Sequence, residues 1–467
     1  MHRVLPVCAA LMLVPIAARG DDPPDKTETV IRLTVSPMAE RKPALYHQLL
    51  PELREMNPGN PILGYLKCFM EQDRFFGDKE VVEQREKWLS MPLKDLPVKE
   101  LQNYGGIALK RADEAARLTD PDWQSLLPLR RDGLYLLVPE VQKLRSLAAA
   151  LEVRMRGEIA DKRFDDALVT AKTLFALSRH LGEHPTLIGG LVGLAIASRT
   201  ADKLDEFIGQ PGAPNLYWAL TDLPNPLVGW RNGIQGDRMW LGVALQGIPG
   251  RIPLDPERRA KLIKIMQDLS DVSRLEKDKK KIDVEAWLNE RANKPGYLEG
   301  ARKRLIETGF PPGPHLDKLP PLQVILVDEV VSFEIERDNQ MKVMNLPYWQ
   351  VEALRAAKPA VKAAPEDSLL GGLISSFHKV RRSHARLEQR IALLRCVEGL
   401  RMYAAAHKGK LPAALADVPV PLPVDPINGR PFNYSVKDDT AILRGTPPPG
   451  QEKVAFFNVQ YEIKIVQ

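Results

Sequence analysis

The segment His180–His184, with the sequence HLGEH, has the residue types and spacing of a metal-dependent hydrolase motif. In the pattern H-x-x-E-H, two histidines one helical turn apart bind Zn²⁺ and the glutamate acts as general base. The candidates here are His180 and His184 as metal ligands and Glu183 as the catalytic residue. This chemistry requires an unbroken helix through both histidines, so that the two rings lie on one face.

Two neighbouring residues argue against such a helix. Gly182 lies between the histidines and is typical of a helix C-terminus, and Pro185 disfavours the helical conformation at His184. We therefore expect the helix to end within the motif, which places the histidines at the negative end of the helix dipole. We favour this structural role over a metal site and predict no cofactor.

Other catalytic patterns are missing from the sequence. It contains no G-x-S-x-G and no glycine loop that precedes a lysine and a hydroxyl residue. The adjacent carboxylates Asp165-Asp166 and Asp438-Asp439 point in different directions, so neither pair suits acid/base work. Whether the protein is an enzyme stays open, and a non-catalytic role is favoured.

The elements that must position the motif are helices joined by short turns. Apolar residues at steps of three and four predict a helix over 140–159 and, after a tight reversal at 160–163, a second one over Phe164–Gly182. The next helix, Pro185–Ile208, has Thr186 as its N-cap and no charge until Arg199. Its uncharged part is too short to cross a bilayer, so we expect neighbouring helices to enclose it. Its glycines allow close approach of their backbones.

Helices also dominate the rest of the chain up to residue 354. The pattern predicts a short strand or extended arm at Thr29–Val35. Further helices are predicted at 43–56, 60–76, 78–89, 98–118, within 253–309, and at 322–344. The hairpin around Gly157–Ala167 is similar to one tetratricopeptide-type hairpin, although no second copy follows at a fixed period.

The N-terminus predicts an exported protein. Residues 1–20 combine His2 and Arg3, an apolar stretch over Val4–Ile16 and a small-x-small site at 18–20, as in a secretory signal peptide. Removing them takes away two of the 66 basic residues and none of the 60 acidic ones, so the net charge falls from +6 to +4. We expect a secreted or periplasmic protein with no transmembrane anchor after signal removal. Whether Cys68 and Cys396 form a bridge stays open.

Two basic stretches were weighed as binding surfaces. The lysines of 277–281 alternate with acids and lack interleaved aromatic residues, so a solvated helix face is favoured and no nucleic-acid partner is expected. The stretch 378–386 holds two histidines and three arginines. A basic, solvated helix face is favoured here as well, and contact with anionic lipid or a wall polymer is the alternative.

The last hundred residues differ from the rest. A long helix from about Leu369 or His378 to His407 precedes a proline-rich loop, a β-hairpin over 432–436 and 440–444, and one or two strands within 454–466. The predicted fold class is mainly α, with a helical-hairpin domain, tetratricopeptide-like or an irregular bundle, followed by a small α+β module of one helix against a short antiparallel sheet. The predicted domains are the signal at 1–20, the helical domain at 21–354, an Ala/Pro/Lys linker at 355–368 and the module at 369–467.

Two segments of this module resemble the soluble tail of type II secretion major pseudopilins. They are Tyr403–Pro412, YAAAHKGKLP, and Pro423–Tyr434, PVDPINGRPFNY. In that family a Y-x-x-x-x-G-x-x-P region leads from the long helix to a P-x-D-P-x-G-x-P-x-x-Y loop and a small sheet. The resemblance covers about 65 residues. We find no counterpart of the family's calcium-binding loop and expect no prepilin leader.

The chain as a whole, especially 182–224 and 382–448, is similar to an uncharacterised group of large exported bacterial proteins that join a helical region to this tail. That group implies no activity. Our leading hypothesis is a non-catalytic helical scaffold or binding protein of the cell envelope, whose partner is another envelope protein or a wall polymer. The alternatives are a zinc-dependent hydrolase that uses the H-x-x-E-H motif and an accessory component of a secretion or pilus-like assembly.

Overall fold

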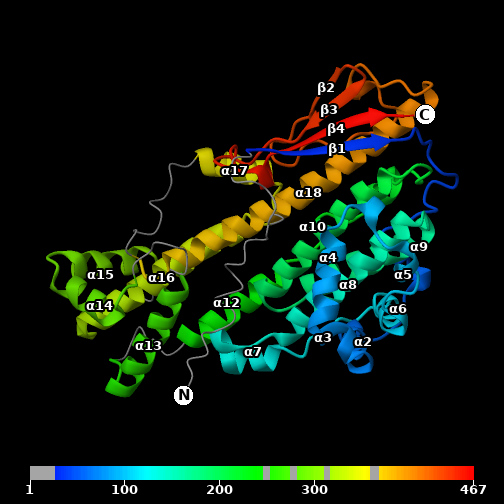
Figure 1. The fold of residues 1–467 in the computed structure, drawn as a ribbon. Helices are drawn as coiled ribbons and strands as arrows, with labels where there is room; N and C mark the ends of the chain where they lie inside the picture. Colours follow the sequence, from blue (N-terminus) through cyan, green and yellow to red (C-terminus); the bar gives the residue numbers. More distant parts are fainter. Residues whose placement is uncertain (1–26, 246–252, 274–280, 310–315, 358–367, 467) are drawn as a thin grey trace. The chain divides into compact units, whose positions relative to one another are not determined.

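The computed structural model describes residues 27–245, 253–273, 281–309, 316–357 and 368–466 (Figure 1). Helices make up most of these residues, and one small four-stranded sheet lies near the C-terminus, so the predicted fold class is confirmed. The contacts between residues divide the chain into two compact units, each with more contacts inside it than to the other. The first contains 125–137 and 234–382, and the second contains the described residues before 125 together with 138–233 and 383–466.

Three consecutive helices form the centre of the second unit. They are α8 (Pro139–Ala160), α9 (Phe164–Gly182) and α10 (Leu187–Ile208), and each packs against the other two. Their bounds agree with the periodicity of the sequence, and Thr186 caps α10 as predicted, because its side chain accepts a hydrogen bond from the Gly189 N–H. The apolar half of α10 is enclosed by its neighbours, as its composition requires.

Glycines permit the close packing of α9 against α10 and against the segment around Gly229. A Cβ at Gly193 would lie 2.5 Å from the backbone oxygen of Ser178, and one at Gly182 would lie 2.7 Å from the backbone nitrogen of Gly229. Real Cβ atoms do not approach backbone atoms this closely, so only glycine fits at these two positions. The predicted role of the small residues in α10 is confirmed.

Short helices formed by the residues before α8 pack against α8, α9 and one another. They are α2 (Pro61–Glu71), α3 (Asp73–Gly77), α4 (Lys79–Ser90), α5 (Val98–Leu101) and α6 (Gly106–Ala115), with the 3₁₀ turns η1 (Leu53–Glu55) and η2 (Leu93–Asp95). The predicted helix over 43–56 was wrong, because only η1 forms there. Pro51, in the interior of this segment, lacks the N–H group that a helix would need there.

The sheet has the order β1-β4-β3-β2. Its strands are β1 (Thr29–Val35), β2 (Asn433–Lys437), β3 (Thr440–Arg444) and β4 (Val459–Ile465). The antiparallel part, β2 with β3 and β3 with β4, was predicted. The sheet is nevertheless mixed, because β1 pairs in parallel with β4, from Thr29 opposite Val459 to Val35 opposite Ile465. In Figure 1 the blue β1 therefore lies beside the red β4, although more than 400 residues separate them.

The two faces of the sheet follow the alternation of its strands. Leu33, Ile463 and Ala441 lie opposite one another on three strands and are all buried. The other face is mostly polar, although Val30 and Ile442 also lie on it. Arg32 and Glu462 form an ion pair there, with Nε and Oε2 2.9 Å apart. The face with Leu33 therefore packs against the rest of the second unit, and the face with Arg32 is exposed to solvent.

The long helix α18 (Gly371–Ala406) joins this sheet to α10 through a buried charge network. Arg390 on α18 contacts both Asp205 on α10 and the hydroxyl of Tyr461 on β4, and Tyr461 donates to Asp205 at 2.9 Å. Burial raises the pKa of Asp205 to about 6 despite the adjacent guanidinium. A second buried pair, Glu398 with Arg401 at 2.9 Å, lies further along α18.

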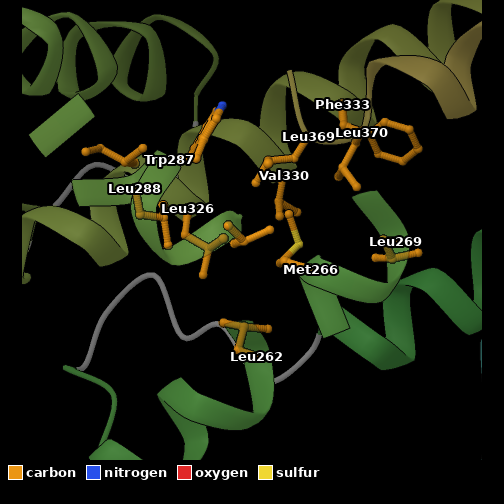
Figure 2. Close-up of a cluster of buried hydrophobic side chains, with 12 residues drawn as sticks. Leu262, Met266, Leu269, Trp287, Leu288, Leu326, Val330, Phe333, Leu369 and Leu370 are labelled. Carbon is orange, nitrogen blue, oxygen red and sulfur yellow. The ribbon is translucent and has the colours of Figure 1, made fainter. Parts of the chain in front are cut away.

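The first unit has its own apolar core. Its described elements are α7 (Leu126–Asp132), η3 (Gly133–Tyr135), α13 (Pro256–Ser273), α14 (Val284–Asn293), α15 (Tyr297–Glu307), η4 (Leu316–Lys318), α16 (Pro321–Met341), α17 (Tyr348–Ala357) and parts of α12 (Arg231–Leu245) and α18. Figure 2 shows how Met266 from α13, Trp287 from α14 and Val330 from α16 converge with Leu369 and Leu370. The helices predicted within 253–309 and at 322–344 are confirmed.

Several sequence predictions lie outside the described residues. They are the signal peptide at 1–20, the lysines of 277–280 and residues 358–367 of the linker, so the linker stays a prediction. The helix α17 was not predicted, and it includes the first three residues assigned to that linker. Within the described residues, no helix combines the length and apolar composition needed to cross a membrane.

Candidate functional site

The H-x-x-E-H segment lies at the junction between α9 and α10. Helix α9 ends at Gly182, Glu183 is its C-cap residue, and Thr186 is already extended before α10 begins. The predicted break inside the motif is therefore confirmed. The two histidines occupy different structural environments, because only His180 belongs to the helix.

His180 is held by two aromatic residues from other parts of the second unit. Its Nδ1 lies 3.0 Å from the hydroxyl of Tyr65 on α2, and its backbone oxygen accepts from the Trp123 indole N–H at 3.1 Å. Burial lowers the pKa of His180 to about 4, with the nearby Arg179 adding to the effect. The ring is therefore neutral at neutral pH and fixes the end of α9 against α2.

His184 is completely buried and hydrogen-bonded to its own turn. Its Nδ1 accepts from the Thr186 backbone N–H at 3.2 Å and lies 2.8 Å from the Thr186 hydroxyl. Because a backbone N–H can only donate, Nδ1 is unprotonated and the neutral ring carries its proton on Nε2. That Nε2 faces Glu140 on α8 at 3.8 Å and has no hydrogen-bond partner among the described residues. The ring also packs edge-on against Trp123, with centroids 4.6 Å apart.

Glu183 contacts Asn232, in a segment that neither histidine ring contacts by a described hydrogen bond. It is exposed, and its Oε2 accepts from the side-chain amide of Asn232 at 2.8 Å. The three candidate residues thus take three separate sets of partners. In the part of the chain that the structure describes, no group of three or more His, Cys, Asp or Glu residues could hold a metal ion.

The order Glu140, His184, Thr186 places a carboxylate, an imidazole and a hydroxyl in one row, as in a nucleophilic triad. The hydroxyl, however, accepts from the Gly189 N–H at 3.4 Å as the N-cap of α10, and Thr186 is only 7% exposed. Gly189 must be glycine here, since its Cβ would lie 2.3 Å from the His184 Cβ. The arrangement can fix the angle between α9 and α10, and it gives a substrate no access to the hydroxyl.

A partly buried ionic cluster between α6, α8 and α9, three turns of α9 away from this junction, was missed by sequence reasoning. Arg154 on α8 binds both oxygens of Asp113 on α6, at 2.6 and 3.0 Å, and donates from Nε to Thr170 on α9. Thr170 donates in turn to Glu158 at 2.6 Å. Burial raises the pKa of Glu158 to about 7 in spite of Arg154. The only signal in the sequence was the spacing of four residues between Arg154 and Glu158.

The predicted solvated face at 378–386 was wrong. His384 is 3% exposed and packs against Trp230 with ring centroids 4.0 Å apart. Arg386 lies 3.6 Å from the ring centre of Phe456 and donates to its backbone oxygen, and burial lowers the pKa of Arg386 to about 10. The aromatic partners come from distant segments, so periodicity along the helix could not reveal them.

The loop of the pseudopilin-like tail is closed around one buried carboxylate. Asp425 of the P-x-D-P segment accepts from the N–H groups of Ile427 and Thr446 and from the amide of Gln389 on α18, all between 2.7 and 2.9 Å. It is fully buried. This carboxylate therefore fastens the loop both to α18 and to the segment after β3. Among the described residues, Cys68 and Cys396 are both buried and form no disulfide.

Comparison of the chain with family models, with curated proteins and with solved structures found no match in any of the three.

Proposed function

We propose that this chain is an exported, non-catalytic helical scaffold or binding protein of the cell envelope, and that its C-terminal α+β module holds the partner. The observation that carries the proposal is the way the sheet is fixed. Arg390 ties α18, α10 and β4 together at one buried point, and Asp425 fastens the loop before β2 to the same helix. A surface held this rigidly loses little entropy when it binds.

The outer face of the sheet is the surface that this anchoring presents. Arg32 and Thr34 on β1, Lys464 on β4 and Ser435 on β2 are exposed there. The strand β2 is an edge strand, since the sheet order places it after β3 with no strand beyond. A polar face with exposed charges suits an envelope protein or a wall polymer better than an apolar ligand.

Site-specific photo-cross-linking in cells tests the proposal. A photoreactive amino acid replaces Lys464 or Ser435, and a matched variant carries it at the exposed Glu83 on α4. We expect the full-length chain to be exported and to cross-link one envelope component from positions 464 and 435 but not from 83. Retention of the chain in the cytoplasm, or equal labelling from all three positions, would contradict the proposal.

A second candidate function is favoured by one specific feature of the tail. The order of long helix, loop closed around a buried Asp425 and small antiparallel hairpin is the order that the pseudopilin resemblance implies. This supports an accessory role in a secretion or pilus-like assembly. If the component captured from residues 369–467 were no part of such an assembly, this second function would be abandoned and the first retained.

A further inference from the structure

Helices α2 and α6 pack against each other in the second unit (Figure 1). A Cβ at Gly64 would lie 2.7 Å from the Ala115 Cβ, and one at Gly106 would lie 3.8 Å from the Gln72 side chain. These contacts join the beginning of each helix to the end of the other. The pair therefore presents one continuous outer face made from both helices.

Large apolar side chains are exposed on this face. Leu63 and Met70 lie seven residues apart on α2, hence on one side of the helix, and are 52% and 82% exposed. Ile107, in the first turn of α6, is 57% exposed. Because α6 begins where α2 ends, Ile107 and Met70 lie at the same end of the pair. The sequence places no polar residue at these three positions, although all three face solvent.

Lysines occupy the same outer face. Lys67 lies between Leu63 and Met70 along α2, and Lys110 lies one turn after Ile107 on α6. Both are exposed, and neither has an ion-pair partner among the described residues. Glu114, one further turn along α6, is also exposed, and we take it as the boundary of this face.

We propose that this face, the Leu63–Lys67–Met70 row with Ile107 and Lys110, binds the surface of a membrane rich in anionic lipid. Exposed apolar side chains enter the interface while adjacent lysines meet the lipid phosphates, as in interfacial amphipathic helices. Charge complementarity favours this occupant, because lipid phosphates attract both exposed ammonium groups and a neutral apolar partner does not. The binding adds a second attachment to the envelope besides the partner of the C-terminal module.

Vesicle co-sedimentation with the purified chain, residues 21–467, tests the inference. Vesicles of phosphatidylcholine with phosphatidylglycerol are compared with pure phosphatidylcholine. We expect binding to the anionic vesicles only, and about a tenfold or greater loss of affinity in the double variant K67E/K110E, because each lysine near such a surface contributes about fivefold. The double variant M70S/I107S should also bind about tenfold more weakly.

The control variant K318E/I306S changes one exposed lysine and one exposed apolar residue of the first unit and should bind as the unchanged chain does. Equal binding to both kinds of vesicle, no binding, or an undiminished affinity in K67E/K110E would overturn the inference. Loss in K67E/K110E alone would overturn the insertion of Met70 and Ile107. The inference uses the proposed envelope location, but purified components give its result whether or not cross-linking in cells succeeds.

Discussion

Histidine is common in catalytic sites, but His184 stabilises the junction between α9 and α10. Its Nδ1 accepts from the Thr186 N–H and its ring fills the space between Trp123 and Gly189. The H-x-x-E-H pattern would bring His180 and His184 to one ion only if α9 continued through both, and α9 ends at Gly182. The side-chain roles thus depend on where the helix ends.

The first prediction distinguishes a structural role of His184 from a role as a zinc ligand. His184→Ala should lower the free energy of unfolding by about 2–4 kcal/mol, because it removes a buried ring and leaves a cavity. Glu183→Gln, at an exposed position, should change it by less than about 0.5 kcal/mol. Urea unfolding measures both, and metal analysis of the purified unchanged chain should find far less than one zinc per molecule. One zinc per chain that is lost in His184→Ala would restore the hydrolase hypothesis.

Glu158 should make stability depend on pH. Its pKa is about 7 in the folded protein and 4.5 ordinarily, so folding favours the protonated acid. Below pH 4.5 the acid is protonated in both states and costs nothing. As the pH rises from 4.5 to 7 the unfolded chain ionises first, so stability falls by about 3 kcal/mol and the loss is complete above pH 7.

Unfolding at pH 5, 6, 7 and 8 tests this second prediction. Glu158→Gln cannot ionise, so it should gain stability relative to the unchanged chain as the pH rises, while the exposed Glu83→Gln should follow the unchanged chain. Other buried acids, such as Asp205, titrate equally in all three proteins and cancel in the comparison. A constant difference between Glu158→Gln and the unchanged chain across this range would show that Glu158 does not titrate there.

Some of these features could be predicted from the sequence and others could not. The end of α9 could be predicted, because Gly182 and Pro185 act on the local backbone. The partners of His184, Arg386 and Arg154 could not, because Trp123, Phe456 and Asp113 reach them only after the chain has folded. A charged residue that is buried by distant partners has the same local pattern as one on a solvated face.

At the scale of elements, the contact between α9 and α10 depends on glycine. Gly193→Ala should lower the free energy of unfolding by about 2–4 kcal/mol, since its Cβ would lie 2.5 Å from the Ser178 oxygen and the helices would have to move apart. The matched variant Gly300→Ala, on α15, meets only the end of the Arg304 side chain and should raise stability by about 0.5–1 kcal/mol.

Thermal or urea unfolding compares the two glycine variants. Similar effects in both would mean that α9 and α10 are not packed as described. The order of helices and strands was predicted largely from the sequence, because periodicity, caps and turns are local features. The parallel pairing of β1 with β4 was not predicted, because no local pattern in Thr29–Val35 names a partner more than 400 residues away.

For the molecule as a whole, the second unit joins residues 27–124 to residues 383–466. The strand β1 completes the sheet, and α18 reaches from that sheet to α10 through Arg390. The division predicted at 355–368 was drawn from composition alone, and composition does not show that 27–124 and 383–466 share one unit. Export, the envelope partner and the membrane-binding face remain proposals that concern the whole protein.

Photo-cross-linking in cells from the outer face of the sheet tests the central claim most directly. The account predicts that a photoreactive residue at position 464 or 435 captures one envelope component in the exported chain, and that position 83 does not. Capture from position 83 alone, or a chain that stays in the cytoplasm, would contradict the claim that the C-terminal module binds an envelope partner.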